Sequence, residues 1–272
     1  MLIFVLIVKL INIITINTWK CDGDYHTRMR LLADQLLALK PGIIACQECF
    51  FSNDGRVDTL RFLAEKLKMN YVFLPGRFKK RHYEGSLVDS YSGLGILSAF
   101  PITSFKHFDL PNVPDDNERK VLLAEIELSP EVRITIVNTH LTHLRYEVEL
   151  RKNQAKVVAD IANKNKKDNY SIICGDFNAK IGSTEINTLI SKTKAIDCYA
   201  AGNGIKPRYS LVDSYIRNTP ICVDHLFALP YQGKRIYPNL MNSGIVLNVP
   251  DKRTGLYPSD HFGISTTLVL DN

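Results

Sequence analysis

Apolar residues recur along the chain with two different spacings. Segments 28–40, 57–68 and 146–164 repeat them every three to four residues, as amphipathic helices do. A short helix is also expected from Ser183 to Ser191, with Ser183 and Thr184 as candidate caps. Shorter apolar runs are typical of strands. Strands are expected at 12–17, 42–48, 71–75, 92–100, 120–128, 132–141, 171–178, 221–229, 243–249 and 261–270.

The order of these elements predicts a layered α/β fold. Helices and strands alternate early in the chain, and strands dominate later. Several strands are apolar almost throughout, which indicates that both of their faces are covered. Mixed sheets with helices outside satisfy both observations. No repeat or linker-like segment divides the sequence.

The first ten residues form an N-terminal extension whose role the sequence leaves open. The run MLIFVLIV is apolar, lacks a basic start and is too short to span a bilayer as a helix. A strand extension, a leader and a start-codon artefact all remain open. A cytoplasmic location is favoured, and a leader would instead indicate secretion or a membrane surface.

Composition changes this picture little. The 272 residues carry a net charge of +6, which mildly favours anionic partners. Six cysteines are present, but CxxC spacing occurs only at Cys46 and Cys49, with no second pair to complete a zinc site. Cys46, Cys174 and Cys222 lie in apolar strand-like runs, where a free thiol packs as a small hydrophobe, and Cys49 is expected in a loop. Disulfides remain an open alternative. Nothing indicates a stable protein partner, and a monomer is expected.

Polar residues that packing does not require lie at the strand ends. Asn17, Glu48 and His140 each close a predicted strand. The others are Asp176 and Asn178 in GDFN, Asp224 within an apolar run, and Asp260 and His261 before the last strand. Ligands bind where the loops at strand ends share a crevice. Convergence would bring together carboxylates, amides and imidazoles.

Each residue also has a structural explanation when taken singly. Asp176 and Asn178 could form an Asx-turn, and Asp260 could cap the next segment. A lone His140 is more often a rim or core histidine. A buried Asp224 nevertheless needs a partner, and clustered carboxylates need a cation. Oxygen ligands without thiolates favour Mg²⁺, with Mn²⁺ as the alternative, over Zn²⁺.

The motifs TIN (15–17), CQE (46–48), NTHL (138–141), GDFN (175–178), VDHLF (223–227) and SDHFGI (259–264) occur in that order. Together they resemble the endonuclease/exonuclease/phosphatase superfamily, which includes deoxyribonuclease I-like nucleases, neutral sphingomyelinases and inositol polyphosphate 5-phosphatases. The resemblance implies one catalytic domain over residues 11–272. It implies a four-layer α/β sandwich, with two mixed β-sheets face to face and helices outside. The implied activity is metal-dependent phosphoester hydrolysis.

The resemblance also implies a metal-binding set. Glu48 corresponds to the main metal ligand, with Asn17 nearby and Asp260 as a further contributor.

The remaining motif residues correspond to catalytic groups. Asp176 and His261 are the candidates for activating the attacking water, and Asp224 would orient His261. Asn178 and His140 would bind the phosphoryl oxygens. Gly175 is expected to permit a tight turn, after which Asp176 and Asn178 point to the same side of an extended backbone.

One departure from the family pattern concerns the middle strand. SGLGILSAFPI (92–102) lacks the Glu that deoxyribonuclease-like members have there, and Ser92 or Gly93 stands near that position. The partner that the resemblance implies for His140 is therefore absent from this strand. Tyr91, next to this position, is a candidate for contacting phosphate.

A basic segment, RFKKRHY (77–83), favours nucleic acid over phospholipid as the substrate. Arg77, Lys79, Lys80 and Arg81 would grip phosphates beside stacking aromatic rings, and Arg145 is a further rim candidate. A merely solvated loop explains the segment equally well. A non-catalytic phosphate-binding scaffold is the alternative class, but it would not need to keep Glu48, Asp176 and His261.

Overall fold

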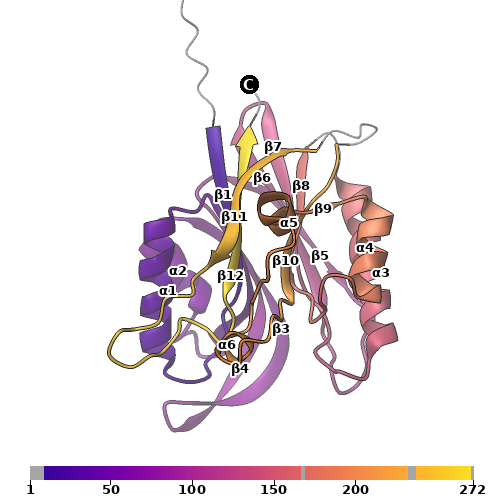
Figure 1. Cartoon of the computed structure of the whole chain (residues 1–272). Coiled ribbons are helices and arrows are strands. Elements are labelled where there is room, and N and C mark those ends of the chain that lie inside the picture. The colour runs from indigo at the N-terminus through magenta and orange to yellow at the C-terminus, as the bar shows by residue number, and fades with distance from the viewer. Residues whose placement is uncertain (1–8, 167–168, 232–236, 271–272) are drawn as a thin grey trace, which may run out of the picture.

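The structure is a computed structural model that describes residues 9–166, 169–231 and 237–270. The segment MLIFVLIV lies outside the described residues, so its prediction stays open. Two six-stranded mixed sheets pack face to face, with helices on both outer sides (Figure 1). This arrangement confirms the predicted α/β sandwich. None of the helices in the described ranges combines the length and apolar character that a membrane crossing requires.

The two sheets are built from different parts of the chain. The first has the order β11 (Asn239–Val246), β12 (Gly263–Leu270), β1 (Lys9–Asn17), β2 (Ile43–Ser52), β4 (Ser86–Ser98) and β3 (Asn70–Tyr83). The second has the order β5 (Ile102–Asp109), β6 (Lys120–Ser129), β7 (Val132–His140), β8 (Tyr170–Asp176), β10 (Asp224–Ala228) and β9 (Ile196–Asp197). The parallel pairs are β1 with β2 and β7 with β8, and the other pairs are antiparallel.

Helices cover the outer face of each sheet. The first sheet is covered by α1 (Tyr25–Leu39) and α2 (Thr59–Leu67), and the second by α3 (Val148–Asn165) and α4 (Thr184–Thr193) (Figure 1). Two short helices, α5 (Cys198–Asn203) and α6 (Val212–Ile216), lie in the segment between β9 and β10. The largest apolar cluster lies between the sheets, and a smaller one lies under each helix layer. Strands covered on both faces explain the continuously apolar runs of the sequence.

A buried amide pair joins the two sheets. Gln47 of β2 donates through Nε2 to Oδ1 of Asn138 in β7 at 2.7 Å. The Nδ2 of Asn138 donates in turn to the carbonyl oxygens of Cys46 and Gly95 at 2.9 and 3.0 Å. These bonds run from one sheet to the other, so this pair fixes the sheets against each other.

Several predicted elements differ from those observed. The strand predicted at 71–75 continues to Tyr83 and pairs with β4, so the basic segment 77–83 is a β-ribbon and not a loop. Strand β2 also continues past Glu48. Asp224 begins β10 and does not lie inside it. Strand β5 was missed because its residues are mostly exposed, which leaves no apolar run. All six cysteines are buried and free, and Cys49, expected in a loop, lies within β2.

Candidate active site

Three neighbouring strands of the second sheet place catalytic candidates in one row. His140 ends β7, Asp176 ends β8, and the parallel register sets them side by side. Asp224, the first residue of antiparallel β10, is opposite Asp176. The pairing of the backbone therefore fixes the spacing of these side chains before any of them forms a contact.

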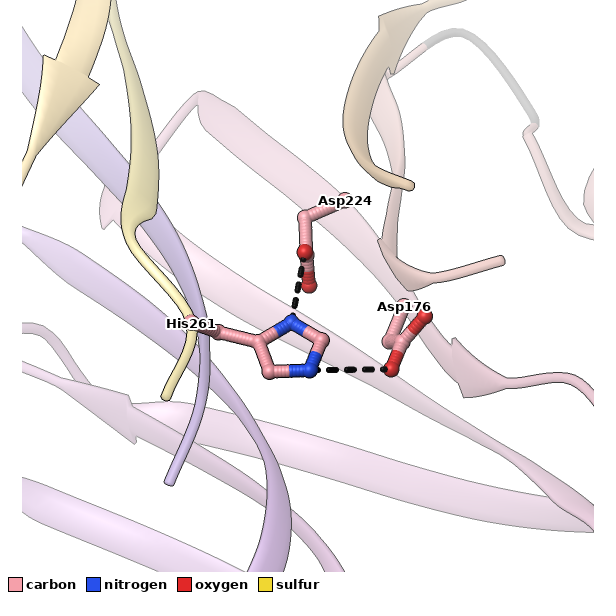
Figure 2. Close-up of side chains that lie close together, drawn as sticks. All are labelled: Asp176, Asp224 and His261. Carbon is pink, nitrogen blue, oxygen red and sulfur yellow. Dashed lines mark hydrogen bonds and ion pairs between the residues drawn. The ribbon is translucent and has the colours of Figure 1, made fainter. Parts of the chain in front are cut away.

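His261 completes the group from the first sheet. It precedes β12, and its Nδ1 lies 2.8 Å from Oδ2 of Asp224. Its Nε2 points to Oδ2 of Asp176 at 3.9 Å, so the imidazole stands between the two carboxylates (Figure 2). The antiparallel bridge between Leu211 and His261 and the bond from its N–H to Ser259 Oγ hold the backbone in place.

These groups have strongly shifted pKa values. Burial lowers the pKa of His261, but the charges of Asp224, Asp176 and Asp260 outweigh it and raise the pKa to about 10. Burial and the negative charge of Asp224 raise the pKa of Asp176 to about 7. His261 is therefore an imidazolium at neutral pH, whereas Asp176 is poised to accept a proton. Burial, with the nearby charges of Arg119 and His261, holds the pKa of His140 well below its usual range.

Asp176 contacts three other candidate residues of the site. Its Oδ2 accepts a bond from Asn17 Nδ2 at 3.1 Å and lies 3.3 Å from His140 Nε2. Its Oδ1 accepts the backbone N–H of Asn178 at 2.9 Å, which is the Asx-turn considered as an alternative. Asn178 has a φ of 48° and donates through Nδ2 to the Leu141 carbonyl. The expectation that Asp176 and Asn178 alternate on an extended backbone was therefore wrong.

Gly175 has a different role from the one predicted. It lies within β8 with a φ of 139°, and a Cβ there would come within 1.9 Å of the Thr139 carbonyl oxygen. Glycine is required because β7 approaches so closely, not because the chain turns. This close approach brings His140 to Asp176.

Glu48 is turned towards the site by a bulge. The register of β2 against β4 shifts between Cys46 and Cys49, and Glu48 has a φ of 55°. Bulges re-aim side chains in this way beside active sites. The Glu48 carboxylate lies 3.1 Å from Lys20 Nζ, which also lies 3.4 Å from Asp22.

The residues around Glu48 fit a hard divalent cation. Burial raises the pKa of Asp260; His261 opposes the rise, and the negative charge of Glu48 adds to it. The charges of Glu48 and Asp260 thus act on one another, and the Lys20 ammonium group partly neutralises Glu48. Oxygen donors in this arrangement suit Mg²⁺ or Mn²⁺.

A second group, Asp176, Asp224 and His261, also brings ligand atoms within 4.8 Å of one another. There His261 Nδ1 is already bonded to Asp224, which indicates an Asp–His pair and not a metal cage.

An open cleft of about 610 Å³ leads to this site. Glu48 and His140 line it, while Asp176 and His261 are buried. Its other walls are the β3–β4 ribbon and the segment 116–120. Its lining is rich in Lys and Arg: Lys20, Arg77, Lys79, Lys80, Arg81, Arg119 and Lys120. The acidic residues there are fewer: Asp22, Glu48, Asp116 and Glu118.

The predicted substrate-binding residues separate into two groups. Arg77, Lys79, Lys80 and Arg81 line the cleft. Within that group, Arg81 also braces the ribbon, because its guanidinium donates to Ser90 Oγ and Ser92 Oγ at 2.9 Å each.

The other two predicted residues do not line the cleft. Tyr91 packs on Phe78 with the ring centroids 5.1 Å apart, and Arg145 is exposed elsewhere.

Sequence reasoning missed Lys20, Arg28 and Arg119. Lys20 and Arg119 carry no local signal, because only the fold brings them to the cleft. Arg28 does carry one, since it occupies a core position of α1 between Tyr25 and Leu32. A charged residue on the apolar stripe of a helix indicates a buried polar network.

The family model for the Endonuclease/Exonuclease/phosphatase family matches residues 14–261. The chain therefore belongs to this family, whose members are hydrolases that act on phosphoesters. This confirms the resemblance found in the motifs. Comparison with curated protein sequences gives no match.

Solved structures with the same fold are distant in sequence. A humanized D. rerio TDP2 with 14 mutations is 19% identical, with a TM-score of 0.75 over 95% of this chain and 98% of that one. An endonuclease/exonuclease/phosphatase from Beutenbergia cavernae DSM 12333 is 19% identical, with a TM-score of 0.76 over 97% and 72%. The human Nocturnin catalytic domain with bound sulfate is 17% identical, with a TM-score of 0.71 over 97% of each chain. These likenesses concern the fold.

Proposed function

We propose that this protein is a Mg²⁺-dependent phosphodiesterase that cleaves nucleic acid by in-line attack of water on phosphorus. The observation that carries the proposal is the position of His261 between Asp224 and Asp176, at a cleft that Glu48 lines. An imidazolium, a carboxylate with a pKa near neutrality and a cation-binding edge are the groups that phosphoester hydrolysis requires.

In this proposal the buried carboxylate of Asp176 takes the proton of the attacking water as the new P–O bond forms. The P–O bond to the leaving oxygen breaks in line with the attack, and the proton returns through the solvent of the open cleft to the leaving alkoxide. Its pKa of about 7 gives it a useful basic fraction at neutral pH. His261 stays charged and donates through Nε2 to a phosphoryl oxygen, while Asp224 fixes its ring through Nδ1. Neutral His140 and the Asn178 amide donate to the remaining phosphoryl oxygens as negative charge develops.

The cation-binding edge comprises Glu48, Asn17 and Asp260. A divalent cation held there supplies charge neutralisation at the phosphoryl group. Lys20 Nζ lies 3.1 Å from the Glu48 carboxylate and would have to release or share that contact if Glu48 held the ion.

The basic cleft supports nucleic acid as the substrate. Seven Lys and Arg side chains line it against four Asp and Glu. A polyanion that neutralises such a row releases counterions, so binding should weaken steeply as salt rises. This distribution favours an extended phosphate chain over a single small phosphoester.

The first test is nicking of supercoiled plasmid by the purified protein with Mg²⁺, with and without EDTA. His261→Ala should abolish nicking, and His107→Ala, on the exposed strand β5, should not. Activity that survives EDTA would contradict the metal-dependent mechanism. If plasmid is untouched while sphingomyelin or a small phosphodiester is hydrolysed, the reaction class stands and nucleic acid is the wrong substrate.

A further inference from the structure

Arg28 is a buried cation whose guanidinium is hydrogen-bonded to backbone carbonyl oxygens. It lies on α1 with no exposed surface, and it forms no ion pair with any residue of the described ranges. A buried guanidinium is costly unless all of its donors are used. Its partners in this fold are backbone carbonyl oxygens.

The guanidinium has five N–H donors, and five carbonyl oxygens accept from it. Its Nε donates to Asp22 at 2.8 Å. Four of the five carbonyls belong to the loop after β1: Thr18, Trp19, Lys20 and Asp22. The fifth is that of Pro258, at 3.0 Å from Nη1, which also donates to Thr18.

These two segments carry the candidate metal-binding edge. The loop 18–22 directly follows Asn17 and presents Lys20 to Glu48. Pro258 stands two residues before Asp260, and Ser259 Oγ donates to the Asn17 carbonyl at 2.6 Å. Arg28 therefore ties together two segments that are more than 200 residues apart in the chain.

The loop adopts a conformation that needs such support. Trp19 and Lys20 have φ values of 56° and 43°, which non-glycine residues seldom adopt. The successive carbonyl oxygens of Thr18, Trp19 and Lys20 then accept hydrogen bonds from the guanidinium. The Trp19 ring also lies over Arg28, 4.7 Å from the guanidinium carbon to the ring centroid.

We propose that Arg28 is a positioning residue for metal binding, which holds the 18–22 loop and the Pro258–Asp260 segment in the geometry that the cation requires. The inference rests on the proposed function, because it places the cation at Glu48, Asn17 and Asp260. Arg28 is fully buried and contacts the backbone of these two segments, so it would act on the cation only through them.

The test compares Arg28→Lys and Arg28→Met with Leu36→Ala. Leu36 lies on the same helix and is equally buried, but it contributes only to the apolar core. Each variant is titrated with Mg²⁺ under native conditions, and the free energy of unfolding is measured in parallel. Trp19 is the only tryptophan in the sequence, so its fluorescence reports the loop directly in the titration.

We expect both Arg28 variants to raise the Mg²⁺ concentration at half-saturation by about 10- to 100-fold and to shift Trp19 emission. Lysine keeps the charge but not the five-donor fork, so it should not rescue the effect. Leu36→Ala should lose stability and keep the wild-type midpoint.

Two outcomes separate the inference from the proposed function. An unchanged Mg²⁺ midpoint in folded Arg28→Lys, or an equal shift in Leu36→Ala, would overturn the positioning role. Failure of the wild-type protein to bind Mg²⁺ at all would instead overturn the proposed function.

Discussion

Asp224 Oδ2 and His261 Nδ1 lie 2.8 Å apart, and both side chains are buried. The bond holds the imidazole with Nε2 directed at Asp176, and the carboxylate charge helps to keep the ring protonated. Strand pairing places Asp224 opposite Asp176, so one backbone register positions both partners of the histidine.

Asp224→Asn is expected to lower kcat by roughly 10²- to 10⁴-fold while the fold is retained. The amide keeps the shape of the side chain but removes the charge and can select the wrong tautomer of His261. Steady-state kinetics on a phosphodiester substrate measures the effect. Asp213→Asn, in an exposed pair with Arg217, is the control and should leave kcat unchanged. A wild-type kcat in Asp224→Asn would remove the charged histidine from the mechanism.

Glu48→Gln is expected to raise the Mg²⁺ concentration needed for half-maximal activity by at least about tenfold, because a neutral amide binds hard cations less well than a carboxylate. Activity measured across a Mg²⁺ titration gives the midpoint. Glu127→Gln, which removes an outlying carboxylate paired with Arg133, should keep the wild-type midpoint. Equal midpoints for Glu48→Gln and the wild type would place the cation elsewhere.

Gly175→Ala is expected to destabilise the fold by at least about 3 kcal/mol. The added Cβ would meet the Thr139 carbonyl oxygen at 1.9 Å, so β7 and β8 would have to separate. Gly182→Ala tests the backbone effect alone, since its φ is 86° and nothing lies near its Cβ position; it should cost only about 1–2 kcal/mol. Denaturant unfolding measures both changes. Similar losses for the two variants would show that the close strand approach is unimportant.

His225 should make the protein sensitive to acid. Burial lowers its pKa from 6.5 to about 4, and its Nε2 donates to the Ala179 carbonyl at 2.8 Å. A depressed pKa in the folded state contributes stability above pH 6.5 that is lost as the pH falls through about 4. At 1.36 kcal/mol per pKa unit, the contribution is on the order of 3 kcal/mol.

His225→Gln keeps a donor for Ala179 but cannot titrate in this range. The difference in unfolding free energy between wild type and variant should therefore shrink from pH 7 to pH 4. Denaturant unfolding at several pH values measures it. A difference that stays constant with pH would show that His225 does not carry the acid sensitivity.

The sequence by itself determined the residue types of the site and most of the elements. Apolar spacing located the long helices, and the continuously apolar runs indicated covered sheets. Asn17, His140 and Asp176 could be placed at strand ends because each directly follows a run that must be buried. Such information depends only on residues that are close together in the chain, so it can be read from the sequence.

Only the tertiary structure decided how distant segments meet. The need for Gly175 comes from β7, and the role of Arg28 comes partly from Pro258. The basic segment 77–83 is a ribbon because β4 supplies its partner, although its own residues are polar enough for a loop. Hydrogen bonds, close approach and charge compensation depend on separations in space, which residue order along a chain does not specify.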